Sequence, residues 1–373
     1  CGSEELSMTL TNYWWLLLWL VLVGGLLSVV MPREPVRVLG KTEYRWGWLP
    51  ALILACPYVI WAGFRTYFGD TMAYRSWFHA ISSVGEEFQV VLSGGAKDPG
   101  FSILSALIKG LIGDQTTLFF LLIAAFQMYC VVHFFRRYST DFLLCMLMFV
   151  LSTDYLSWML NGMRQFIAVC IILLGFGLVF RKKYKLAVLV ILLAAIIHAS
   201  ALMMLPIIFF IQGRAWNWKM LLMLVCVGAA ILLIDPFTAL LDSALADTQY
   251  SDIITDEIWT NDDGTNILRA LFYSIPAILS LVGKRYIDRD APPEVNLCVN
   301  CGVCTAAIYF LSVFSSGIYV GRLPIYTTLQ GYAAVPWIIE HTFTKSSAKV
   351  ITGGLVLGFL AFFYYQAHAW GLL

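Results

Sequence analysis

The sequence predicts an all-α, polytopic integral membrane protein with roughly 10–13 transmembrane helices, counting re-entrant or broken segments. Of its 373 residues, 60% are hydrophobic and 13% are charged, whereas a soluble domain carries about 25% charged residues. The mean hydropathy is +0.79. Apolar runs recur from end to end with no long polar stretch between them, so we expect one integral-membrane domain over residues 1–373, after a short N-terminal tail at 1–12.

Segments of about 17–25 mostly apolar residues are long enough to cross a bilayer as helices. The candidates, in chain order, are 13–31, 48–64, 117–135, 141–158, 163–180, 218–235, 266–282, 297–316, 322–340 and 349–367.

Two further apolar segments do not fit a single crossing. Residues 101–112 are too few to cross comfortably, and residues 186–211 are too many for one span and too few for two. We expect the first to dip into the membrane or lie in its interface, and the second to form two half-depth helices that meet near His198. Irregular backbone at membrane depth is tolerated only where protein buries it or water reaches it. Both segments therefore indicate a cavity.

Charge sets the expected orientation, because Lys and Arg accumulate in cytoplasmic loops. The basic connections are 33–45, 136–137, 181–185, 283–289 and 345–349. Between Lys219 and Arg269 there are eight acidic residues and no basic one, so we place the acidic loop 236–265 outside.

The outer side would also hold residues 65–98, of which 70–93 suit an interfacial helix. The alternative is a single tilted span over 186–205, which would put the acidic loop in the cytoplasm.

This topology brings Arg65, Arg164, Arg322 and His198 to the outer side. Cations at membrane depth are expensive and are rarely kept without a use. Guanidinium groups that converge there suit a phosphate or diphosphate headgroup. The competing interpretation is that each arginine only reaches toward lipid headgroups, and that His198 makes an ordinary interhelical hydrogen bond.

Smaller polar residues accompany these cations. Asn161 and Gln165 flank Arg164 with hydrogen-bonding groups, and Tyr319 precedes Arg322. Asp70 either pairs with Arg65 or caps a helix, or it orients an arginine or binds a sugar hydroxyl. Both interpretations of Asp70 remain open.

Several chemistries find no support in the sequence. The net charge of +1 carries no nucleic-acid signal, and no glycine-rich loop leads into Lys-Ser/Thr for nucleotide phosphates. No Asp-x-Asp pair stands in the predicted outer loops. Cys298, Cys301 and Cys304 lack the fourth cysteine of an iron–sulfur run. We therefore expect neither a metal site nor a cofactor.

At these residues the chain resembles the EpsG-like branch of the Wzy-type polysaccharide polymerases. The resemblance runs through most of the chain and is carried by the order and spacing of its pieces. These are Ala62-Gly-Phe-Arg65, Gly69-Asp-Thr71 with Tyr74, Asp98-Pro-Gly-Phe101, Asn161-Gly-Met-Arg-Gln-Phe-Ile-Ala168, Arg181-Lys-Lys183, Ile197-His-Ala-Ser-Ala201 and Gly321-Arg322. Family members often carry Gly-Thr-Asp or Gly-Ala-Asp where this chain has Phe68-Gly69-Asp70.

The resemblance implies a membrane glycosyltransferase of GT-C-like architecture in the bacterial cytoplasmic membrane, with its active site on the outer side. It would join oligosaccharide repeat units carried on polyprenyl diphosphate, without a metal, and make an exopolysaccharide, capsule or other surface polymer. The lipid-linked glycan would be both donor and acceptor, membrane lipid would surround it, and a flippase and a chain-length regulator would be possible partners.

The residues then take these roles as a hypothesis. Arg164 and Arg322 clamp the diphosphate with help from Arg65, because fixed cations stabilise a leaving group that gains negative charge. His198 or Asp70 accepts the proton of the acceptor hydroxyl. Gln165 orients the substrate, and the remaining substrate-binding positions are Asn161 and Tyr319.

Two rival functions share some of these features. A transporter or flippase also has broken helices and buried charges, although internal repeats are not evident here. A glycan ligase would use the same lipid-linked donor, and the sequence does not separate it from a polymerase.

Overall fold

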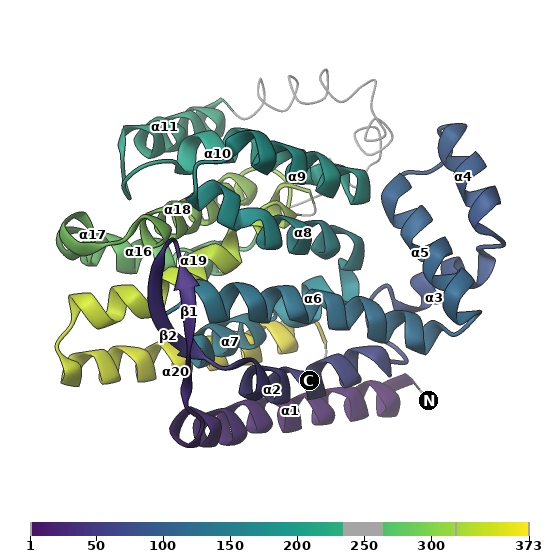
Figure 1. The fold of residues 1–373 in the computed structure, drawn as a ribbon, viewed down its shortest axis with the longest axis horizontal. Coiled ribbons are helices and arrows are strands. Elements are labelled where there is room, and N and C mark those ends of the chain that lie inside the picture. The colour runs from purple at the N-terminus through teal and green to yellow at the C-terminus, as the bar shows by residue number, and fades with distance from the viewer. Residues whose placement is uncertain (1, 234–263, 318, 372–373) are drawn as a thin grey trace. The chain divides into compact units, whose positions relative to one another are not determined.

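The computed structural model describes residues 2–233, 264–317 and 319–371, and within these the chain is almost entirely helical (Figure 1). This confirms the predicted all-α polytopic membrane class. Five described helices are long and apolar enough to cross a membrane, or six if one bent pair forms a single span, and five shorter apolar helices accompany them. The predicted acidic loop 236–265 lies almost wholly outside the described residues.

The chain divides into two compact units, 1–202 with 344–373 and 203–343. The elements of the first unit are α1 (Gly2–Val30), β1 (Arg33–Val38), β2 (Lys41–Trp46), α2 (Trp48–Gly63), α3 (Thr71–Ala80), α4 (Val84–Leu92), α5 (Pro99–Ile112), α6 (Thr116–Tyr138), α7 (Phe142–Leu151), the π-helix Tyr155–Asn161, α8 (Met163–Phe180), α9 (Tyr184–Ile197) and α20 (Lys345–Ala369), and the 3-10 helix Ala199–Met203 runs to the boundary. Helix α1 passes through the residues predicted as a tail.

The second unit contains α10 (Met204–Ile211), α11 (Trp218–Leu232), α15 (Ile267–Tyr273), α16 (Ile275–Val282), α17 (Lys284–Asp290), α18 (Pro293–Val313), the 3-10 turn Val320–Arg322 and α19 (Ile325–Thr342). Its centre is the packing of α18 against α19, where Gly302 and Gly331 face each other so closely that a Cβ on Gly331 would lie 2.9 Å from the Gly302 Cα.

In the first unit, α6 packs against α2 and α8, and α8 packs against α9, while α3, α4 and α5 form a separate small group of helices (Figure 1). An aromatic core joins this group to the long helices. Phe78 stacks on Phe119 at 4.4 Å between ring centroids, and Phe101 and Met163 are buried in the same cluster. The core therefore fixes the small helical group against the start of α8.

The sequence interpretation missed a β-hairpin in the basic connection 33–45. Strands β1 and β2 pair antiparallel, and the turn residues Leu39 and Gly40 both have positive φ, as a two-residue type I′ turn requires. Arg136 at the end of α6 anchors the hairpin by donating to the Trp46 carbonyl at 2.6 Å and pairing with Glu34 at 2.8 Å.

Three predicted elements are interrupted in the structure. The interfacial helix 70–93 is two helices, since the Lys109 ammonium donates to three carbonyls at the end of α3 and Ser83 caps α4. The span 141–158 bends by 72° between α7 and the π-helix. The span 266–282 is interrupted at Ser274, just before Pro276.

The predicted break in residues 186–211 is confirmed. Helix α9 ends at Ile197, and His198 takes an extended conformation (φ −156°, ψ 116°) before the 3-10 helix. Residues 101–112 also belong to a short helix, the 14-residue α5.

Candidate functional site

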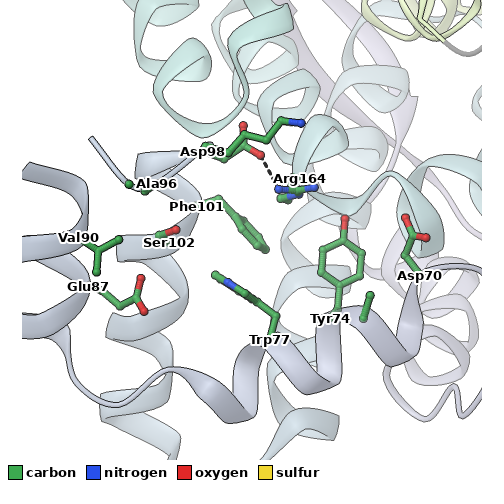
Figure 2. Close-up of a pocket in the computed structure, with 13 residues that line it drawn as sticks. Asp70, Tyr74, Trp77, Glu87, Val90, Ala96, Asp98, Phe101, Ser102 and Arg164 are labelled. Carbon is green, nitrogen blue, oxygen red and sulfur yellow. Dashed lines mark hydrogen bonds and ion pairs between the residues drawn. The ribbon is translucent and has the colours of Figure 1, made fainter. Parts of the chain in front are cut away.

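A polar cavity of about 410 Å³ opens between α3, α4, α5 and the first turn of α8. Figure 2 shows its lining side chains, with Arg164 near the middle. The aromatic residues of the lining are Tyr74, Trp77 and Phe101, and its charged residues are Asp70, Glu87, Lys97, Asp98 and Arg164. Such a volume lies within the range of about 300–1,000 Å³ that small-molecule sites occupy.

Arg164 is held in this cavity by an ion pair with Asp98. Its Nη1 donates to Asp98 Oδ2 at 2.7 Å, and the side chains are 39% and 5% exposed respectively. Asp98 directly precedes α5 but makes no side-chain capping hydrogen bond to that helix, and its carboxylate instead accepts the bond from Arg164. A guanidinium has five N–H donors in a rigid fork, so the bond to Asp98 restrains the orientation of the group without using all of its donors.

The residues after Asp98 explain how α5 reaches its place. Pro99 begins the helix, where its missing N–H costs nothing. Gly100 then lies against the end of α9, since a Cβ there would stand 2.8 Å from Ile196 Cγ2 and 2.9 Å from the Ile196 carbonyl oxygen. This close approach sets the Asp98–Arg164 pair beside the segment that carries His198.

His198 belongs to a short hydrogen-bonded chain that returns to α8. Its Nδ1 lies 2.8 Å from Ser200 Oγ, and Gln165 Nε2 donates to the same oxygen at 3.2 Å. Gln165 directly follows Arg164. The structure therefore links the predicted residues His198 and Gln165 through a serine that the sequence interpretation did not select.

Asp70 and Asn161 also come together. The Asp70 backbone N–H donates to Asn161 Oδ1 at 3.0 Å. Gly69 has φ +48°, and a Cβ there would lie 2.5 Å from the same oxygen. Tyr74 Oη donates to the Asn161 carbonyl at 3.2 Å, and burial raises the pKa of Tyr74, so the phenol stays neutral. Asn161 thus positions the loop that brings Asp70 to the cavity.

Arg65 is buried beneath this loop and does not line the cavity. Its guanidinium donates to Thr71 Oγ1 at 3.2 Å and to the Ala62 carbonyl at 2.8 Å, and it lies 4.0 Å from the centre of the Phe120 ring. Burial lowers the pKa of Arg65 to about 10, so it remains charged at neutral pH. These contacts tie the end of α2 to the start of α3.

Arg322 and Tyr319 belong to the second unit. Arg322 is exposed at the end of the 3-10 turn, and the Tyr319 backbone N–H donates to Ser316 Oγ at 3.0 Å. Gly321 packs closely here, because a Cβ would lie 2.5 Å from Thr265 Oγ1.

Sequence reasoning missed Asp98, Ser200 and Glu87 as parts of the site. Asp98 and Ser200 stand inside sequence pieces that carry the family resemblance, and a polar residue in such a piece was the available signal. Trp77 and Glu87 both fall within residues 70–93, which the sequence predicted as one interfacial helix. The break between α3 and α4 lets both face the same cavity.

A helical, multi-pass membrane protein with a charged cavity beside its apolar helices is the class that the fold and the site define. The model of the EpsG family matches residues 48–371, which is most of the chain, so the protein belongs to the EpsG family. Membership fits a membrane protein of the polysaccharide-polymerase type. No curated protein and no solved structure matches the chain.

Proposed function

We propose that this protein polymerises polyprenyl-diphosphate-linked oligosaccharide repeat units into a bacterial surface polysaccharide at the outer face of the cytoplasmic membrane. The observation that carries the proposal is the Arg164–Asp98 pair in a polar cavity, one residue from the chain Gln165–Ser200–His198. Family membership supports the polymerase class.

In the proposed reaction, an acceptor hydroxyl oxygen attacks the anomeric carbon of the donor glycan, and the bond from that carbon to the diphosphate oxygen breaks. The polyprenyl diphosphate leaves with the bonding electrons. Arg164, already oriented by Asp98, donates to phosphate oxygens as their charge increases. Preorganised donors of this kind stabilise the transition state because they need not reorient during the reaction.

We assign His198 as the base that takes the acceptor proton. This requires the tautomer in which Nδ1–H donates to Ser200 Oγ, because a neutral imidazole protonated at Nδ1 has its basic lone pair on Nε2. Ser200 can accept this bond and that from Gln165 together, because a hydroxyl oxygen has two lone pairs. Asp70, exposed at the cavity, is the alternative base.

The other residues take supporting roles. Arg65 and Asn161 position the loop that carries Asp70, as their hydrogen bonds indicate. Arg322 and Tyr319 bind the diphosphate in this proposal, on the strength of the sequence pattern alone. We further propose that arginines replace a divalent metal as the counter-charge of the diphosphate.

The decisive experiment is polymerisation by the purified chain, given a synthetic polyprenyl-diphosphate oligosaccharide, with chelator present and no nucleotide. A ladder of repeat units is expected. Arg164→Lys should abolish it, because an ammonium cannot make the bidentate contact of a guanidinium. Arg289→Lys is the matched control, since that arginine pairs with Asp290 at an exposed position.

Each alternative gives a different result. Movement of unextended substrate across proteoliposome membranes would indicate a transporter. Transfer of a preformed glycan to a different acceptor, without a ladder, would indicate a ligase. A ladder that forms only with a divalent cation would support the polymerase function and reject the metal-free mechanism.

A further inference from the structure

We infer that the cavity between α3, α4 and α5 is a carbohydrate subsite that binds an uncharged sugar ring of the glycan, and that Glu87 determines its specificity. The inference rests on the proposed function, because it names the part of the lipid-linked substrate that this cavity holds. Arg164 then stands where the sugar site meets the diphosphate.

The charges of the lining favour a neutral ligand. The lining has three carboxylates, Asp70, Glu87 and Asp98, against the two cations Lys97 and Arg164. Asp98 already neutralises Arg164 at 2.7 Å. A diphosphate bound inside the cavity would face the remaining carboxylates, and like charges at short range repel each other. A sugar hydroxyl can donate to a carboxylate and accept from an ammonium, so it suits both kinds of group.

The aromatic residues supply a flat apolar surface along the same cavity. Trp77 stacks on Phe101 with ring centroids 5.1 Å apart and planes 19° apart, and Tyr74 stands next to Trp77 in the lining (Figure 2). In Figure 2 Asp70 and Glu87 lie toward opposite ends of this aromatic row. A few placed polar groups at the edges of an apolar wall are typical of small-molecule sites.

Glu87 differs from its neighbour Glu86 in a way that points to a ligand. Both are in the first turn of α4, where an acidic residue is favoured by the helix dipole. Glu86 is exposed and bonded to Ser82, whereas Glu87 is half-buried and lines the cavity. Among the described residues the Glu87 carboxylate has no hydrogen-bond partner. The Glu87 carboxylate is therefore placed to bind a ligand in the cavity, and it does not stabilise α4 through a side-chain hydrogen bond.

The test is saturation-transfer difference NMR on the purified full chain in nanodiscs. The probes are the methyl glycosides of glucose, galactose, N-acetylglucosamine and glucuronate, with inorganic diphosphate as competitor. We expect at least one neutral glycoside to bind, and methyl glucuronide to bind at least tenfold more weakly. Glu87→Gln should weaken the neutral glycoside about tenfold, or about 1.4 kcal/mol, and Glu86→Gln should leave its Kd unchanged.

The proposal is overturned if glucuronide binds best, if diphosphate displaces every glycoside, or if Glu87→Gln binds like the wild type. Ser102→Ala, which removes another polar group of the lining, checks the result if Glu87→Gln does not fold. Sugar binding without polymerisation would reject the proposed function alone. Polymerisation by a chain that binds no neutral glycoside would reject the subsite alone.

Discussion

Replacement of Asp98 by asparagine isolates the interaction on which the candidate site depends. The substitution keeps the size of the side chain and removes its charge. Asp98 is 5% exposed and pairs with Arg164 at 2.7 Å. Asp98→Asn therefore leaves a partly buried guanidinium without its counter-charge and loosens the orientation of Arg164 in the cavity.

The expected loss of stability follows from the exposure of the two partners. Removing one partner of a fully buried pair costs about 3–5 kcal/mol. Arg164 is 39% exposed, so water screens part of that cost, and a hydrogen bond to a charged group is worth about 1.5–3 kcal/mol. We expect Asp98→Asn to lower the free energy of unfolding by about 1.5–3 kcal/mol.

The same change at an exposed pair gives the control. Asp288 pairs with Lys284 at 2.6 Å, with side chains 43% and 44% exposed. Exposed pairs contribute about 0–1 kcal/mol. Asp288→Asn should therefore have a small effect, measured by the same denaturant titration of the purified protein in detergent.

A double-mutant cycle decides whether the two side chains act as a pair. With Asp98→Asn and Arg164→Gln we expect a coupling free energy of at least about 1 kcal/mol, because residues in contact are not additive. Polymer formation should fall in both single variants. Additivity within about 0.5 kcal/mol, or an Asp98→Asn variant with full polymerisation, would refute the reasoning.

Two further predictions compare glycines, with unfolding free energy as the measurement. Gly100→Ala puts a Cβ 2.8 Å from a side chain of α9 and should lower the free energy of unfolding by about 1–3 kcal/mol. Gly110→Ala on the same helix meets nothing closer than 3.9 Å and should raise the free energy of unfolding by up to about 1 kcal/mol. Gly69→Ala combines φ +48° with a Cβ 2.5 Å from the Asn161 amide oxygen. Gly113→Ala has φ +69° but open space around it, so its free energy of unfolding should fall by only about 1–2 kcal/mol. The loss for Gly69→Ala should be larger than that. Equal losses within either pair would contradict the packing described here.

The fold class was predictable because hydropathy acts locally. Helices such as Met163–Phe180 and Thr116–Tyr138 end within a few residues of the predicted spans, since apolar length alone selects them. The break at His198 was predictable for the same reason, because residues 186–211 match neither one span nor two. The bend after Leu151 was not, since the residues on both sides of it are as apolar as a straight span.

The site was predictable in part. Arg164, Gln165 and His198 drew attention because polar groups among apolar residues are costly. Their connection through Ser200 depends on how α9 ends against α8. Asp98 stands in a piece that carries the family resemblance but was not selected as a site residue, because an acid before Pro99 in a polar turn is ordinary in sequence and becomes unusual only when it is buried.

The sequence by itself determined that this chain is a helical membrane protein, where its apolar segments lie and which cations stand among them. Burial in lipid depends on residue composition over a window, and that information is local. Only the tertiary structure decided that Asp98 would hold Arg164, that Arg65 would be enclosed under the Asp70 loop, and that Trp77 and Glu87 would share a cavity. The Asp98–Arg164 pair joins residues far apart in the chain, and close packing at positions such as Gly100 fixes the helices that carry them.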